Sequence, residues 1–214
     1  MIIDLFADVA CPWCWIGERR LKNALDERGI DATVRWRPYM LQRGLPPGGI
    51  PWNELVETKF GGWARARPMF AHVAAAGARE GLRYDFEAIT RAPNTRDAHR
   101  VLLLAQDRGR LWEAADALFS AYFAEGRDVT EAAVLAEAAA GAGLDAAEVR
   151  EMLAGDAYAA EVDAAQELAD RSGITGVPMA VFDGRFGVSG AQPPEVFRMA
   201  IDRALGDGGN AAAG

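Results

Sequence analysis

The sequence predicts an α/β fold with a βαβ unit near its N-terminus and a ββα unit near its C-terminus, separated by a large all-helical insertion. Two strand-like segments flank a helical one over residues 2–37, and a strand–turn–strand pattern followed by a helix occupies residues 178–205. The stretch between these units is dominated by Ala, Leu, Glu and Arg. The domains that this pattern predicts are a discontinuous α/β domain over 1–53 and 173–206, a helical insertion over 54–172 and a flexible tail over 207–214.

The first unit begins with a short strand and continues into a helix. Residues 2–7 form an apolar run, and apolar side chains recur at helical spacing over 13–28. Gly29 is a residue typical of the end of a helix. Apolar and polar side chains alternate over residues 32–37, which predicts a second strand that returns parallel to the first.

The middle of the chain reads as a loop followed by helices. Residues 38–52 are rich in Pro and Gly, which favours a loop over the surface or over a site. The helical segments that follow, separated mostly by glycines, are 54–80, 95–108, 111–124, 130–140, 145–155 and 157–172. No fixed period links them, so a solenoid is disfavoured.

The last unit predicts a β-hairpin and a helix. Residues 178–182 are apolar, the Asp-Gly pair at 183–184 is a hairpin turn signal, and residues 185–188 supply the second strand. Two prolines at 193–194 suit the start of a helix.

The composition indicates a soluble protein that does not bind nucleic acid. Half of the 214 residues are apolar, and 31 acidic against 23 basic side chains give a formal charge of −8, which would repel a phosphate backbone. The first residues lack the basic start of a secretory signal, and no apolar run reaches the roughly 18 residues that cross a bilayer. We therefore expect a cytoplasmic protein with no membrane partner.

The two cysteines of the chain, Cys11 and Cys14, follow the first predicted strand and open the first predicted helix. A Cys-x-x-Cys spacing at this point of a βαβ unit is typical of a redox motif. Because the cytosol keeps thiols reduced, a disulfide there is usually transient and catalytic rather than structural. The sequence therefore predicts a thiol–disulfide redox centre on a thioredoxin-like fold.

Each residue of the run Cys11-Pro12-Trp13-Cys14 has an expected part in this chemistry. Cys11 lies beside the unpaired N–H groups of the helix start, whose dipole favours a thiolate, so we expect it to be the exposed attacking thiol. Helix geometry turns Cys14 inward as the resolving thiol that breaks a mixed disulfide. Pro12 fits the first helical turn, and Trp13 is expected to be exposed beside the substrate.

A second feature, Gly176-Val177-Pro178, directly precedes the first strand of the hairpin. A cis proline makes a tight turn in such a place, so we expect the Val177–Pro178 peptide bond to be cis. This turn would leave the N–H and C=O of Val177 free to pair with an extended substrate beside the sulfurs.

The same residues also admit structural interpretations. A zinc site needs about four ligands, and only His72 and His99 are available besides the cysteines and carboxylates, without the spacing of a zinc finger. We therefore expect no metal and no cofactor. Asn94 or Thr95 is more consistent with a helix cap, and His99 with an interior histidine, than with a polar contact near the redox pair.

Together with the long helical stretch between them, the cysteine run and the Gly-Val-Pro turn resemble the DsbA-like thioredoxin superfamily, in which a helical domain interrupts a thioredoxin fold. More narrowly, the chain resembles the FrnE-like branch over about residues 2–205. The runs that carry this resemblance are Asp8-Val9-Ala10-Cys11-Pro12-Trp13-Cys14-Trp15-Ile16-Gly17, Trp36-Arg37-Pro38-Tyr39, Lys59-Phe60-Gly61, Asn94-Thr95 with Ala98-His99-Arg100, and Ser189-Gly190-Ala191-Gln192.

The resemblance implies a protein disulfide oxidoreductase or isomerase with Cys11 as nucleophile, Cys14 as resolving thiol and Pro178 as the cis-proline of the substrate groove. It implies a protein or small-molecule thiol or disulfide as substrate, and a thiol electron partner such as glutathione or thioredoxin. Some relatives carry a second cysteine pair, which this chain lacks. A homodimer is compatible with an exposed aromatic groove.

Two other functions remain open at this point. The first is a glutathione-dependent isomerase or transferase of the 2-hydroxychromene-2-carboxylate isomerase or kappa-class type, in which a single serine or cysteine activates glutathione. The intact Cys14 argues against it, because a second thiol would expel bound glutathione as its disulfide. The second is a non-enzymatic, chaperone-like binder that uses an apolar groove.

Overall fold

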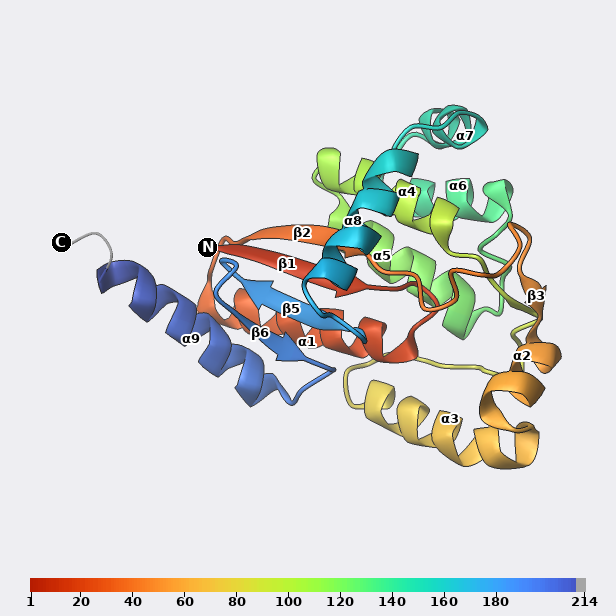
Figure 1. The fold of residues 1–214 in the computed structure, drawn as a ribbon, viewed down its shortest axis with the longest axis horizontal. Coiled ribbons are helices and arrows are strands. Elements are labelled where there is room, and N and C mark those ends of the chain that lie inside the picture. Colours follow the sequence, from red (N-terminus) through yellow and green to blue (C-terminus); the bar gives the residue numbers. More distant parts are fainter. Residues whose placement is uncertain (211–214) are drawn as a thin grey trace.

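The computed structural model describes residues 1–210 and arranges them around a four-stranded mixed sheet (Figure 1). The sheet has the order β2-β1-β5-β6 and consists of β1 (Ile2–Ala7), β2 (Thr33–Pro38), β5 (Met179–Phe182) and β6 (Phe186–Ser189). β1 and β2 are parallel, whereas β5 is antiparallel to both β1 and β6. The predicted βαβ and ββα units are therefore confirmed, and β1 joins them.

Helices cover both faces of this sheet. On one face α1 (Pro12–Arg28) lies beside α9 (Pro194–Asn210), and on the other face α8 (Ala159–Arg171) crosses the strands (Figure 1). α1 ends at Gly29, whose left-handed φ of 60° lets its N–H return to the carbonyls of Leu25 and Asp26. The predicted end of this helix is thus confirmed.

The alternation of side chains along β1 explains why it is buried on both sides. Ile3, Leu5 and Ala7 belong to the main core, which also contains the buried face of α1. Phe6 points the other way and packs in a cluster with Ala169 of α8. A strand with a period of two can contact two helical layers in this way, so β1 is positioned tightly and so is the loop that follows it.

The insertion between β2 and β5 is helical except for one short ladder. Besides α8 it contains α2 (Trp52–Phe60), α3 (Trp63–Ala78), α4 (Arg96–Asp107), α5 (Leu111–Phe119), α6 (Ala132–Gly141) and α7 (Ala146–Ala154). The expectation of an all-helical insertion and a structureless loop is wrong at β3 (Ile50–Pro51) and β4 (Arg91–Ala92), which pair antiparallel. Two residues on each side are too few to produce a strand pattern in the sequence.

The predicted single helix over 54–80 is also wrong, because α2 and α3 are separate. Gly61 and Gly62 lie between them with φ angles of 72° and 90°. Residues with a Cβ atom rarely adopt these angles, so the glycine pair allows the chain to turn sharply.

The predicted helix over 111–124 forms, but its last turn changes type. α5 continues directly into a π-helical turn, η1 (Ser120–Ala124). Tyr122 and Phe123 of this turn are buried in the core. Such π-helical turns occur often at functional sites.

The predicted hairpin forms at the end of the sheet. Asp183 and Gly184 have φ angles of 49° and 68°, which is the pattern of a two-residue type I′ turn. α9 then extends to Asn210, beyond the end that the sequence pattern indicates; the rest of the predicted flexible tail, 211–214, lies outside the described residues. Among residues 1–210, no helix has the length and apolar character that crossing a membrane requires.

Candidate active site

The two cysteines lie where the end of β1 passes into α1. Cys11 has an extended conformation and occupies the cap position before the first helical residue, Pro12. The N–H of Cys11 donates to the carbonyl of Asp8 at 3.0 Å, and the N–H of Cys14 donates to the carbonyl of Cys11 at 2.9 Å. These bonds hold the four-residue run as one tight turn at the positive end of the helix dipole.

Cys11 is less accessible than the sequence suggests. Its side chain lies next to Val177, and its Sγ donates to the Val177 carbonyl at 3.6 Å. Only 5% of Cys11 is exposed, so the expectation of an exposed thiol is wrong in degree. Because Cys11 lines a cavity, a reactant can reach it through that opening. The sequence suggests a free Val177 carbonyl, but in the structure this carbonyl accepts from the Cys11 thiol.

Cys14 is completely buried, as expected for an inward-facing thiol. Burial raises the pKa of the Cys14 thiol well above its usual range, and the adjacent Cys11 raises it further. The N–H of Asp8 donates to Cys14 Sγ at 3.5 Å and acts in the opposite direction. Cys14 is therefore held as a neutral thiol until a reaction removes its proton.

The turn before β5 packs against the cysteine helix. The Val177–Pro178 peptide bond is cis, and Pro178 is buried against Gly17 of α1. Arg20, also on α1, donates to the carbonyls of Ala191 and Gln192 at 2.8 and 3.1 Å. These contacts fix the position of the hairpin relative to the cysteines.

Gly17→Ala is expected to destabilise the protein by about 1–3 kcal/mol, because overpacking is costly in a close-packed site. A Cβ at position 17 would lie 2.8 Å from Cγ of Pro178. Gly141→Ala is the matched control, because that helical glycine has nothing within 4 Å of a new Cβ. Helix propensity alone predicts a gain of up to about 1 kcal/mol for either change. Urea unfolding of both variants measures the difference; equal gains would show that α1 does not press against Pro178.

A buried polar chain leads from Cys14 into the helical insertion. The carboxylate of Asp8 accepts from the N–H of Leu41 at 2.7 Å, and its Oδ1 lies 3.4 Å from Nε2 of His99. Trp36 Nε1 donates to Nδ1 of His99 at 3.1 Å, so Nε2 is the ring nitrogen that faces Asp8, and it makes no hydrogen bond among the described residues. His99 is thus an interior histidine, as favoured, but it is also connected to the residue that binds Cys14.

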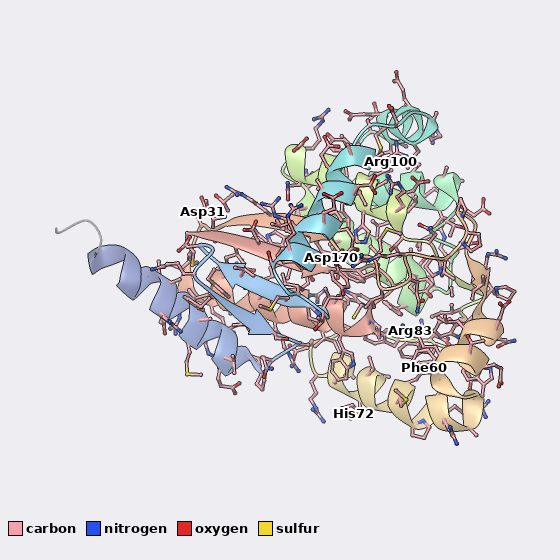
Figure 2. The ribbon with its side chains drawn as sticks, in the orientation of Figure 1. Asp31, Phe60, His72, Arg83, Arg100 and Asp170 are labelled. Carbon is pink, nitrogen blue, oxygen red and sulfur yellow. The ribbon has the colours of Figure 1, made fainter. Side chains whose placement is uncertain are left out.

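The rest of the run around His99 is structural. Thr95 occupies the cap position of α4 but makes no side-chain cap bond, whereas Asn94 Oδ1, one position earlier, accepts from the N–H of Arg96 at 3.0 Å. The guanidinium of Arg100, labelled in Figure 2, donates to the carbonyls of Met152, Gly155 and Ala157. These bonds hold the end of α7 and the segment that leads to α8 against α4.

Tyr84 is a site neighbour that the sequence analysis does not identify. Its hydroxyl donates to the carbonyl of Pro12 at 2.7 Å, and its ring packs edge-on against Trp15. Burial and the nearby thiols raise the pKa of Tyr84, so it remains a protonated donor. Tyr84 lies in an irregular segment after α3, where no periodic pattern predicts burial.

Glu18 is a second residue that the sequence analysis does not single out. It lies one turn after Cys14 on α1, is only 1% exposed, and its Oε2 has no hydrogen-bond partner among the described residues. Burial, and then the charge of Asp116, raise the pKa of Glu18 from 4.5 to about 8. A carboxyl group this close to the cysteine pair is therefore mostly neutral at pH 7.

A cavity of about 600 Å³ lies beside Cys11, between the cysteine turn and the helices α2 and α3. Pro12 and Trp13 form part of its wall, as does η1. Trp13 is half-buried, whereas Trp15, Trp36 and Tyr39 are buried in the core. The expectation that Trp13 is exposed is therefore only partly met, although Trp13 is the most accessible of the four.

The structure thus brings four predicted site residues, Cys11, Cys14, Val177 and Pro178, to one place. Asp8 is an additional neighbour, and a signal for it existed: a charged residue directly follows an apolar strand and precedes the cysteines by three positions. Among residues 1–210, no group of three or more His, Cys, Asp or Glu side chains could hold a metal ion.

Comparisons with known proteins agree with this geometry. The model of the DSBA-like thioredoxin domain family matches residues 2–202. A probable DsbA oxidoreductase from Streptomyces coelicolor is 39% identical, with a TM-score of 0.87 over 96% of this chain and 90% of that one. The uncharacterized protein YwbO from Bacillus subtilis (strain 168) is 25% identical over 201 residues, 93% of this chain and 94% of its own.

The fold is also shared with DsbM, a cytosolic disulfide reductase from Pseudomonas aeruginosa whose structure was solved with GSH. That protein is 21% identical, with a TM-score of 0.65 over 96% of this chain and 99% of its own. A family match over nearly the whole chain, joined to a buried cysteine pair at the start of α1, gives one conclusion: the chain belongs to the DsbA-like thioredoxin domain family.

Proposed function

We propose that the protein is a thiol–disulfide oxidoreductase that exchanges electrons with its substrates through Cys11 and Cys14. The observation that supports this most directly is the difference between the two thiols. Cys11 lines a cavity at the positive end of α1, whereas Cys14 is fully buried behind it with a raised pKa. One thiol can meet a substrate, and the other can react only with its neighbour.

In the reducing direction, the Cys11 thiolate attacks one sulfur of a substrate disulfide. The substrate S–S bond breaks, a mixed disulfide forms at Cys11, and the first substrate thiolate leaves and takes up a proton. The carbonyl of Val177, which accepts from the resting Cys11 thiol at 3.6 Å, is next to the new bond. The Val177 turn, which precedes β5, can also align an extended substrate, because backbone groups beside the sulfurs can pair with a peptide.

Cys14 completes the reaction from its buried position next to Cys11. It loses its proton and attacks Sγ of Cys11, which releases the second substrate thiol and forms the Cys11–Cys14 disulfide. The substrate gains two electrons and the protein dithiol loses them. The N–H of Asp8 stabilises the Cys14 thiolate as it forms, because it donates to this sulfur. Run backwards, the same steps oxidise a substrate dithiol, and alternation between the two directions isomerises disulfides.

The compartment and the partners form part of the same proposal. Both cysteines of the chain belong to the redox pair, as in proteins that work where thiols are kept reduced, so we place the protein in the cytoplasm. Its electron partner is then a thiol compound or protein, such as glutathione or a thioredoxin. The homodimer stays a prediction, which sedimentation of the purified protein would test.

Covalent trapping tests the proposed function. Cys14→Ser protein mixed with oxidised insulin is expected to accumulate a mixed disulfide at Cys11, because the resolving thiol is missing. Intact-mass measurement detects this adduct, and dithiothreitol should release it. Cys11→Ser protein is the control and should form no adduct, since Cys14 is fully buried. A trapped adduct on Cys14 instead, or none on either variant, would refute the proposed roles.

A further inference from the structure

The cavity beside Cys11 has the size and surface of a small-molecule site. Its volume of about 600 Å³ lies within the range of roughly 300–1,000 Å³ that is usual for such sites. Aromatic rings form much of its wall and come from five parts of the chain, namely Trp13, Trp52, Phe60, Phe70, Phe86 and Phe123. Phe70 and Phe86 stack with their ring centres 4.3 Å apart, which makes this wall continuous.

This wall is separate from the surface that would bind an extended peptide. Val177 and Pro178 do not line the cavity, whereas Cys11 touches both surfaces. Apart from the cysteine turn, most of the cavity wall comes from α2, α3 and η1 of the helical insertion. A compound in the cavity would therefore reach the Cys11 sulfur without contacting the Val177–Pro178 turn. In Figure 2, Phe60 and His72 mark this side of the molecule.

The charge of the cavity is opposite to that of the protein. The chain carries a formal charge of −8, yet no Asp or Glu occurs among the described residues that line the cavity. Its two basic side chains are Lys59 of α2 and His72 of α3. Lys59 lies 6.0 Å from the ring centre of Phe60, and within residues 1–210 it takes part in no ion pair. An exposed cation at the edge of an apolar cavity favours a ligand with an anionic group.

From these observations we propose that the preferred substrates are small aromatic disulfides that carry a carboxylate. The aromatic ring enters the cavity beside Phe70 and Phe86, the carboxylate lies near Lys59, and the sulfur meets Cys11. This inference rests on the proposed function, whose chemistry it keeps. Cys11 forms a mixed disulfide with one half of the substrate and releases the other half as a thiolate. Cys14 then displaces the second half, so one disulfide gains the two electrons that the dithiol loses.

Three disulfides separate the contributions of ring and charge. Dithiobis(nitrobenzoate) is aromatic and anionic, dithiodipyridine is aromatic and neutral, and glutathione disulfide is anionic without an aromatic ring. The rate constant of the fully reduced protein with each compound is measured in a single turnover, which needs no other reductant. Each value is divided by the rate constant of N-acetylcysteine with the same compound, which removes the intrinsic reactivity of the disulfide.

The normalised rate for dithiobis(nitrobenzoate) is expected to exceed that for glutathione disulfide by about 10- to 100-fold, the effect of burying one ring. Lys59→Gln should lower the rate for dithiobis(nitrobenzoate) by about 3- to 5-fold and leave dithiodipyridine unchanged. The rate of the wild type with the anionic aromatic compound should also fall with added salt, and this dependence should weaken in Lys59→Gln. Lys59→Arg should restore both properties.

Lys22→Gln is the matched control. The chain has only two lysines, and Lys22 lies on α1, pairs with Asp26 at 2.6 Å and does not line the cavity. It should leave all three rates unchanged. Equal normalised rates for the three compounds, or equal effects of Lys59→Gln and Lys22→Gln, would overturn the inference while insulin reduction upheld the proposed function. Loss of insulin reduction and of all three rates in the wild type would refute both.

Discussion

Cys11→Ser and Cys14→Ser proteins are each expected to reduce insulin at least about 10³-fold more slowly than the wild type, because the two thiols act as one unit. In the proposed mechanism Cys11 makes the first bond to the substrate, and Cys14, which is fully buried beside it, breaks that bond. The rate of insulin precipitation with dithiothreitol as reductant measures the loss. Wild-type protein alkylated while reduced gives the baseline.

The same pair of variants separates the dithiol mechanism from the alternatives. A glutathione-dependent isomerase or transferase needs one activated thiol and should retain its turnover in Cys14→Ser. A chaperone-like binder should tolerate both changes when suppression of aggregation is measured. Retained insulin reduction in Cys14→Ser would therefore contradict the resolving role of Cys14, whereas retention in Cys11→Ser would contradict the whole scheme.

Glu18→Gln is expected to stabilise the folded protein by several kcal/mol above pH 8, on the order of 1.4 kcal/mol for each unit by which folding raises the pKa. The folded state raises the pKa of Glu18 from 4.5 to about 8. Between these two values the folded protein holds a proton that the unfolded chain releases, so wild-type stability falls as pH rises through this window. Below pH 4.5 the carboxyl is protonated in both states and the contribution vanishes.

Urea unfolding of wild type and Glu18→Gln from pH 4 to pH 9 measures this difference. Near pH 4 the two should agree within about 1 kcal/mol, because a neutral carboxyl and an amide differ little in burial cost. Glu113→Gln is the control, because the Glu113 side chain on α5 is half-exposed to solvent, unlike that of Glu18. Its carboxylate lies 3.6 Å from the guanidinium of Arg110. Parallel stability curves for wild type and Glu18→Gln would show that Glu18 is charged in the folded protein.

Local sequence patterns were sufficient for most of the backbone. The alternation over 32–37, the glycine at position 29 and the Asp-Gly pair at 183–184 each act over a few residues, and each predicted the element that forms. The predictions that failed, at β3, β4 and the break between α2 and α3, concern short ladders and a glycine pair inside a helix-rich segment. β3 and β4 form because each pairs with a segment far away in the sequence. The break between α2 and α3 is hard to see because the residues around it are typical of helices.

In the candidate active site, too, local sequence predicts some features and the tertiary structure decides others. The sequence by itself determined that two cysteines stand at the start of a helix and that the second of them faces inward. Only the tertiary structure decided how far Cys11 is covered, because its partner Val177 is 166 positions away. The raised pKa values of Cys14 and Glu18, the contact of Asp8 with His99 and the cavity beside Lys59 have the same origin. Desolvation and cavity shape are set by side chains that meet only after folding, so no spacing along the chain encodes them.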